Sequence, residues 1–142
     1  MPAWRVKAYL GEEVWRSYFK FAFDRNPWDR QVSWYFYKTK SKWSPPPFDD
    51  FLASKRRAYV NNYELYTIHS DLAVDFVGRY ERLENDFAKA LEFIGVRQSI
   101  ALPRTNVSTA RERDYRAYYS PRTKAVVADW YAPEIAMFGY RF

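Results

Sequence analysis

Residues 19–38, FKFAFDRNPWDRQVSWYFYK, constrain the fold more than any other part of the chain. The three phenylalanines at the start of this segment recur at every second position, which is the period of a strand. Asn26-Pro27 follows, and Asn as the N-cap with Pro at the first helical position is a typical helix start. We therefore predict a strand over residues 19–24 and a helix over residues 27–40, which makes the chain α/β rather than a helical bundle.

The other elements follow from helical spacing, helix caps and turn residues. The apolar residues of segment 83–94 repeat at the spacing of one helix face, and Gly11, Gly95 and Gly139 are typical residues just past a helix end. Ser120-Pro121 marks a further helix start. The predicted helices cover residues 3–10, 12–18, 49–59, 80–95, 113–119, 121–130 and 133–138, the predicted strands cover 64–68 and 73–78 with a turn at His69-Ser70-Asp71, and residues 101–111 form a polar loop.

Composition limits the chemistry that these 142 residues can perform. The chain has no cysteine and one histidine, His69, which excludes disulfides, thiol nucleophiles and metal sites built from Cys or several His. Aromatic residues make up 21% of the chain, which excludes intrinsic disorder and indicates one folded domain. Since no apolar run is long enough to span a membrane and no secretory signal opens the sequence, we expect a reducing, bacterial cytoplasm.

Positive charge is concentrated toward both ends of the chain. The formal net charge is +6, and residues 1–48 and 101–142 are basic, whereas residues 49–100 are slightly acidic. If the two ends meet in space, they form a positive surface suited to phosphate, sulfate or a polyanion. A basic nucleic-acid or polyanion-binding module therefore stays an alternative, supported by the sequence pI of about 9.5 and the interleaved aromatic residues. The simpler interpretation is a solvated basic face.

Arg25 is the strongest candidate for binding an anion. It directly follows the predicted strand, and open α/β sheets bind ligands at the carboxyl ends of their strands. The free N–H groups of the following helix point toward the same crevice, and a guanidinium group can bind two phosphate oxygens at once. Ser33 lies about two turns into that helix and can donate its hydroxyl proton. Spacing alone equally allows Arg25 to form a surface ion pair with Asp24 or Asp29.

This segment resembles the 3′-phosphate-binding segment of sulfotransferases that use PAPS (3′-phosphoadenosine 5′-phosphosulfate). Members related to the carbohydrate sulfotransferases read about F-V-R-N-P-[YW]-D-R-x-V-S-x-Y there, and this chain reads FDRNPWDRQVSWY over residues 23–35. The one clear departure is Asp24, where an apolar residue is usual, and its carboxylate could compete with phosphate for Arg25. The resemblance extends to VDFVGRYE at residues 74–81 and to FGYRF at residues 138–142.

The resemblance implies a fold and a reaction. The fold is a P-loop-NTPase-like sulfotransferase fold, N-terminally truncated and helix-rich with a small sheet. It forms one partial domain over residues 1–142, with the 3′-phosphate segment at 19–38 and a helical part at 80–142. The reaction is transfer of a sulfuryl group from PAPS to a hydroxyl or amine, first of all on a carbohydrate, with no metal and no nucleic acid as partner. The residues implied to bind the nucleotide are Arg25 and Ser33, which match the 3′-phosphate site, and Asn106 and Ser108, which fall in a loop that closes on the nucleotide in related enzymes.

Family members also carry a loop for the 5′-phosphosulfate that contains Gly or Ser/Thr together with a Lys or Arg, and no such phrase occurs in this sequence. Glycines occur only at positions 11, 78, 95 and 139. We therefore expect a chain that starts after this loop, is weak or inactive by itself, and has no assigned catalytic residue. Loss of the first strand would leave an unpaired sheet edge at residues 19–24, with three exposed phenylalanines that could promote dimerisation. Longer relatives could also be anchored in a membrane.

Several other residues have a structural interpretation that is simpler than a functional one. His69 fits a solvated turn better than a general base. Glu81 fits an ion pair with Arg79 at a helix start, although it could be a base. Most aromatic residues fit the core, but the indoles at positions 28, 34 and 43 could stack on adenine or a sugar ring.

Overall fold

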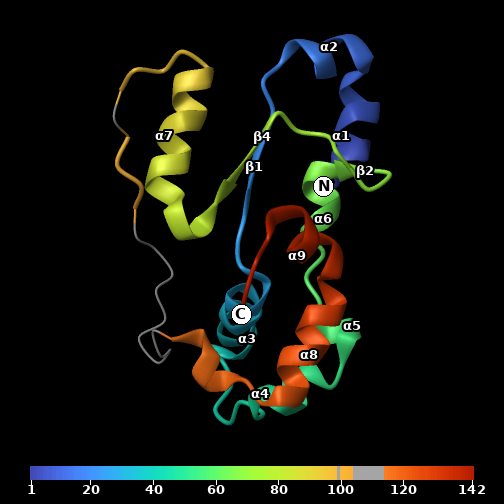
Figure 1. Cartoon of the computed structure of the whole chain (residues 1–142), viewed down its shortest axis with the longest axis vertical. Coiled ribbons are helices and arrows are strands. Elements are labelled where there is room, and N and C mark those ends of the chain that lie inside the picture. Colours follow the sequence, from blue (N-terminus) through green and yellow to red (C-terminus); the bar gives the residue numbers. More distant parts are fainter. Residues whose placement is uncertain (99, 104–113) are drawn as a thin grey trace. The chain divides into compact units, whose positions relative to one another are not determined.

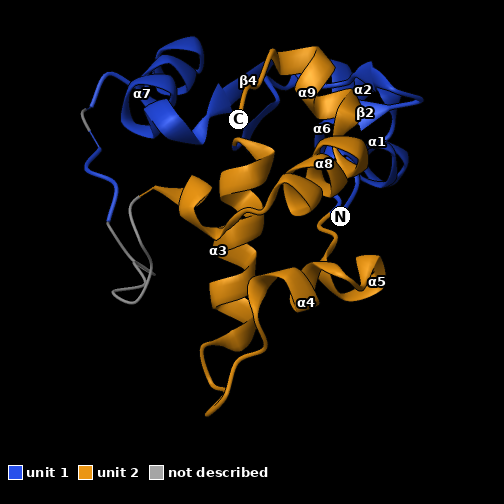
Figure 2. Cartoon of the chain, turned by 60° about the horizontal axis from the view of Figure 1, so that its bottom comes forward, with its two compact units in different colours: residues 1–25, 61–103 blue, residues 26–60, 104–142 orange. Residues whose placement is uncertain are grey.

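The computed structural model describes residues 1–98, 100–103 and 114–142. The chain groups into two compact units, one made of residues 1–25 and 61–103 and the other of residues 26–60 and 104–142 (Figure 2). A single domain over the whole chain stays a prediction. Among the described residues, no helix combines the length and the apolar character needed to cross a bilayer.

The first unit contains a parallel strand pair, a small hairpin and four α-helices (Figure 1). Its helices and paired strands confirm a helix-rich α/β fold with a small sheet. In chain order its elements are α1 (Ala3–Leu10), α2 (Glu12–Ser17), β1 (Phe21–Asp24), α6 (Tyr63–Tyr66), β2 (Thr67–Ile68), β3 (Asp71–Leu72), β4 (Phe76–Arg79), the 3₁₀ turn η1 (Tyr80–Arg82) and α7 (Leu83–Phe93).

The strand predicted at residues 19–24 is confirmed as β1, and it pairs in parallel with β4. The register places Asp24 opposite Arg79. Asp75 holds the start of this register, because its carboxylate accepts from the Lys20 backbone N–H at 2.7 Å and lies 2.8 Å from the Lys20 ammonium. The hydrogen bonds from Lys20 hold the pKa of Asp75 below its ordinary value. This pair joins segments that lie more than fifty residues apart in sequence.

Helix α7 covers one face of the strand pair. The ring of Phe23 lies 6.4 Å from that of Phe87, and Phe19 stacks on Phe93 with 5.1 Å between ring centroids. Both phenylalanines of the β1 segment are half-buried as a result, so the expectation of three exposed rings is wrong for them. Phe21 alone of the three is exposed, with 38% of its surface accessible.

The turn predicted at His69-Ser70-Asp71 is confirmed, but the strands around it differ from the prediction. The hairpin pairs only the two-residue strands β2 and β3. Residues 63–66 form a helical turn instead of a strand, because Tyr66 is buried there and the Thr67 hydroxyl donates to the Tyr63 carbonyl at 2.7 Å. The strand predicted at 73–78 leaves the hairpin and becomes β4, the partner of β1.

The second unit is entirely helical in the residues described. Its core is an aromatic cluster that packs α3 against α8 and the 3₁₀ turn η2. The elements are α3 (Pro27–Thr39), α4 (Phe48–Leu52), α5 (Lys55–Ala58), η2 (Tyr115–Tyr118), α8 (Pro121–Trp130) and α9 (Ala132–Phe138). The buried core residues are Trp28, Val32, Tyr35, Phe48, Leu52, Ala58, Val127, Tyr131 and Tyr140.

The single helix predicted over residues 49–59 is wrong, because α4 and α5 are separate. Ser54 has an extended backbone with φ −115° and ψ 93°, which interrupts the helical hydrogen bonds. Buried polar groups fix the chain just beyond the break. Gln31 donates its amide to the Ala58 carbonyl at 2.7 Å, and the Val60 N–H donates to the Tyr131 hydroxyl at 2.9 Å. These tertiary hydrogen bonds outweigh the local preference for one continuous helix.

Candidate functional site

Arg25 lies where two parallel strands end. It follows β1 directly, and Tyr80 follows β4, so both residues lie at the carboxyl edge of the strand pair. The guanidinium carbon of Arg25 is 4.2 Å from the centre of the Tyr80 ring, and Arg25 is half-buried. This is a cation–π contact, which orients the guanidinium plane. The first unit therefore holds an oriented cation at the edge where α/β folds bind ligands.

Asp86 fixes the turn between β4 and α7, which contains Tyr80. Its carboxylate is buried and accepts from the backbone N–H of Arg79 at 2.8 Å, with the Arg82 guanidinium at 3.4 Å. The hydrogen bond from Arg79 lowers the pKa of Asp86 below its ordinary value, and the positive charges of Arg82 and Lys89 act in the same direction. An ionised Asp86 thus holds the turn from β4 into α7 in place.

Asp24 is buried, with 1% of its surface exposed. Neighbouring residues of a strand point to opposite faces, and Phe23 packs on the α7 face. Asp24 therefore lies on the other face of β1, in register with Arg79. Because Asp24 is buried, an ion pair between it and Arg25 would not be a surface pair, whereas the surface pair with Asp29 stays an alternative. The aromatic partner Tyr80 was not foreseen from the sequence.

The helix start predicted at Asn26-Pro27 is confirmed. The Asn26 side chain accepts from the Trp28 N–H at 3.1 Å, and Pro27 is the first residue of α3. The amide of Asn26 also donates to the Arg141 carbonyl at 2.8 Å, which ties this helix start to the last residues of the chain within the second unit. The cap leaves the remaining N–H groups of the first turn directed out of the helix.

Ser33 lies on the least buried face of α3. Steps of four residues place it between Asp29 and Tyr37, and the Ser33 side chain is half-buried. Arg30 is different, because it is buried and paired with Glu134 at 2.8 Å. Arg25 belongs to the first unit and Ser33 to the second, so the surroundings of each residue are described only within its own unit. Asn106 and Ser108 lie outside the described residues.

The three tryptophans that could stack on a ligand differ in their surroundings. Trp28 is a core residue that donates its indole N–H to the Lys124 carbonyl at 3.1 Å. Trp34 stacks on Tyr37 with ring centroids 5.5 Å apart, whereas Trp43 is fully exposed. In the parts of the chain described, no group of three or more His, Asp or Glu side chains gathers as a metal site would require.

Three of the four glycines follow helix ends, and the fourth lies in a strand. Gly11, Gly95 and Gly139 have φ of 82°, 80° and 64°, which only glycine adopts readily, and they follow the ends of α1, α7 and α9. Gly78 lies inside β4.

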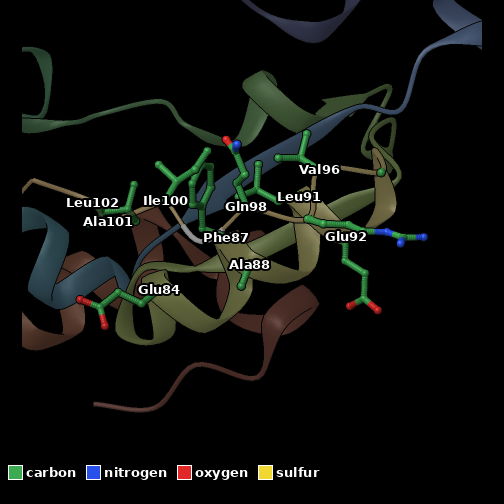
Figure 3. Close-up of a pocket in the computed structure, with 12 residues that line it drawn as sticks. Glu84, Phe87, Ala88, Leu91, Glu92, Val96, Gln98, Ile100, Ala101 and Leu102 are labelled. Atoms are coloured by element: carbon green, nitrogen blue, oxygen red, sulfur yellow. The ribbon is translucent and has the colours of Figure 1, made fainter.

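A pocket of about 850 Å³ follows the outer side of α7. Phe87 and Leu91 point toward Ile100 across it, while Glu84 and Glu92 project outward from the helix (Figure 3). Its apolar floor suits an apolar group rather than a phosphate. The described residues that line it are Glu84, Phe87, Ala88, Leu91, Glu92, Gly95, Val96, Arg97, Gln98, Ile100, Ala101 and Leu102.

Comparison with known proteins gives a family match over nearly the whole chain. Residues 3–141 match the family described as "Sulfotransferase family". An uncharacterized protein of Archaeoglobus fulgidus is 34% identical over 120 residues, which cover 82% of this chain and 98% of that protein. No solved structure matches the chain. On the family match and the position of Arg25 at the strand edge, the chain belongs to the sulfotransferase family.

Proposed function

We propose that this chain acts in sulfuryl transfer from PAPS and that Arg25 and Ser33 bind the 3′-phosphate of the nucleotide. The observation that carries the proposal is the place of Arg25 directly after β1, with its guanidinium held over Tyr80. Membership of the sulfotransferase family supports sulfuryl transfer in general. Asn106 and Ser108 join the proposed nucleotide site by resemblance alone.

The chemistry of these residues fits a ribose 3′-phosphate. A phosphate dianion needs a fixed cation and further hydrogen-bond donors, and an oriented guanidinium supplies two parallel N–H donors. The Ser33 hydroxyl on the accessible face of α3 can supply a third donor. Tyr80 contributes by holding the Arg25 plane, which reduces the entropy lost when the anion binds.

PAPS supplies the sulfuryl group, which passes to an acceptor oxygen or nitrogen as the bond from sulfur to the 5′-phosphate oxygen breaks and the acceptor loses its proton. Residues at the far phosphate of the nucleotide act by positioning, because a fixed nucleotide keeps the reacting end in place. The proposed acceptor is a carbohydrate or another small hydroxyl or amine compound. The proposal assigns residues only at the 3′ end of the nucleotide.

Binding of adenosine 3′,5′-bisphosphate to the 142-residue chain tests the proposal. We expect calorimetric titration to show tighter binding of this nucleotide than of AMP, because only the former carries the 3′-phosphate. Arg25→Ala should weaken binding of the bisphosphate by roughly 10- to 100-fold, the value of a hydrogen-bonded charge, and leave binding of AMP nearly unchanged.

Two controls make the test specific. Arg5→Ala removes the same charge from an exposed position of α1, and Ser41→Ala is the matched control for Ser33→Ala. Neither control should change the affinity for the bisphosphate. Equal affinity for AMP and the bisphosphate, or equal losses in Arg5→Ala and Arg25→Ala, would show that the chain attracts anions only through its net charge.

A further inference from the structure

We propose that the first unit carries a sugar-binding pocket between α1, α6 and the β2–β3 hairpin, specific for a neutral or amino sugar. The elements that form it lie together in Figure 1, where α6 and β2 lie beside α1. The pocket has a volume of about 460 Å³, within the range of about 300–1,000 Å³ typical of small-ligand sites. Its lining residues are Trp4, Tyr63, Glu64, Thr67, Ile68, His69 and Ser70.

Trp4 supplies the aromatic platform of this pocket. It is the second residue of α1, and 54% of its surface is exposed. Most indoles of the chain are engaged by neighbouring groups, as Trp28 is in the core and Trp34 is on Tyr37. Trp4 has no ring or hydrogen-bond partner within the described part of the chain. An indole left open beside a pocket suits the C–H face of a sugar ring, which is apolar while its edge is polar.

Glu64 and His69 supply hydrogen-bonding groups to the lining. Both side chains are exposed, and neither forms an ion pair or hydrogen bond with another described residue. A carboxylate accepts from sugar hydroxyls, and an imidazole can donate or accept according to its tautomer. The pocket thus combines one aromatic face with uncommitted polar groups, the combination that a pyranose ring requires.

The turn of the β2–β3 hairpin has an unusual backbone conformation, which holds His69 in place. His69 and Ser70 both have positive φ, 53° and 72°, whereas two-residue turns of this kind favour Asn-Gly. The Tyr63 hydroxyl donates to the Ser70 carbonyl at 3.0 Å and fixes the turn against α6. Non-glycine residues in this conformation are strained, and such residues are concentrated at ligand sites.

The charge of the lining residues determines which class of sugar the pocket binds. Glu64 is the one carboxylate among the lining residues, and no Lys or Arg belongs to the lining. A sulfated or carboxylated sugar would therefore meet a negative charge without a cation, whereas a hydroxyl or ammonium group would meet an acceptor. In the transfer proposed above, this pocket holds the sugar of the acceptor. That role rests on the proposed function, but sugar binding itself does not.

Sugar titrations of the full 142-residue chain, followed by saturation-transfer NMR and calorimetry, test the inference. The probes are the chitosan trimer, which carries amines, its N-acetylated counterpart, which is neutral, and glucose 6-sulfate. We expect both trimers to bind and the sulfated sugar to bind at least tenfold more weakly. Trp4→Ala should weaken binding of the trimers roughly tenfold or more, and Trp4→Phe should retain most of it, because an aromatic ring remains.

Trp43→Ala is the matched control, since Trp43 is also exposed but lies in the second unit. Glu64→Gln should weaken the amino trimer more than the neutral one. Failure of both trimers to bind the folded chain, or equal losses in Trp4→Ala and Trp43→Ala, would overturn the inference. Adenosine 3′,5′-bisphosphate, titrated in parallel, separates the two proposals. Nucleotide binding without sugar binding rejects only the sugar pocket, and sugar binding without nucleotide binding rejects only the proposed function.

Discussion

Gly78 shows how closely β1 and α7 approach one position of β4. A Cβ added there would lie 2.3 Å and 2.7 Å from two ring carbons of Phe23 and 3.1 Å from the Cβ of Asp86. Phe23 in turn packs on Phe87 of α7. The ring occupies the space that a side chain at position 78 would need, so the glycine is required for packing rather than for its backbone conformation.

We predict that Gly78→Ala destabilises the chain by about 1–3 kcal/mol, the usual cost of forcing a methyl group into a packed site. Urea unfolding followed by circular dichroism measures the change in the free energy of unfolding. The double variant Gly78→Ala/Phe23→Leu should recover part of the loss, because the smaller side chain vacates the contact. Additive losses in the double variant would argue against the steric explanation.

For single residues, the motif that predicts the candidate site can be read from neighbouring positions. The contacts that hold its residues in place come from distant parts of the chain. Arg25 and Ser33 follow from a short segment, because strand alternation and the Asn26 cap are both written in neighbouring residues. Tyr80 and Asp86 could not be assigned, since their contacts depend on parallel pairing between segments far apart in sequence. A tyrosine two positions after a predicted strand glycine carries no signal of a cation–π contact.

Among the elements, α3 and α9 are joined by a buried ion pair. The Arg30 guanidinium lies 2.8 Å from the Glu134 carboxylate, and their side chains are 7% and 2% exposed. Arg30 also lies 4.5 Å over the ring of Tyr131, whose burial raises its pKa to about 12. The two charges are removed from water, so each depends on the other for compensation.

We predict that Glu134→Gln destabilises the chain by roughly 3–5 kcal/mol at neutral pH, because the buried Arg30 charge loses its ion pair with Glu134. Differential scanning calorimetry should show a lower Tm. The double variant Arg30→Met/Glu134→Gln removes both charges and should recover much of the stability. If the double variant is less stable than Glu134→Gln, the ion pair does not explain the loss.

Elements with local caps were predictable, and elements fixed by distant contacts were not. The starts of α3 and α8 are confirmed, and Ser120 forms a capping box with Thr123 in α8. The helical turn at residues 63–66 and the break at Ser54 were predicted wrongly. Burial of Tyr66 decides the first, and tertiary hydrogen bonds of Ala58 and Val60 decide the second. The parallel pairing of β1 with β4 carries no local signal for the same reason.

For the whole molecule, several carboxylates connect stability to pH. Hydrogen bonds from Lys20 lower the pKa of Asp75, and the backbone N–H of Arg79 lowers that of Asp86. Lys7 and Arg16 lower the pKa of Glu12 by hydrogen bonding. A carboxylate whose pKa is lower in the folded than in the unfolded chain stabilises the fold at any pH above its unfolded value.

We predict that stability is constant from neutral pH down to about pH 5 and falls as the pH drops through and below about 4, where unfolded carboxylates take up protons. Thermal unfolding from pH 7 to pH 3 measures this dependence. Asp86→Asn should lower the Tm at pH 7 by roughly 4–8 °C, the effect of about 1–2 kcal/mol, and should flatten the fall toward pH 3. An unchanged pH profile in this variant would exclude Asp86 as a contributor.

The pairing of Phe21 with Phe76 also affects how the chain is made. A ribosome that adds about 5–20 residues per second needs roughly 3 to 11 seconds between synthesis of β1 and synthesis of β4. During this interval the backbone N–H and C=O groups of β1 have no β4 to pair with, beside a phenylalanine-rich sequence prone to self-association. Slower translation across residues 25–75 would lengthen that exposure, so synthesis rate and chaperone supply bear directly on the yield of folded chains.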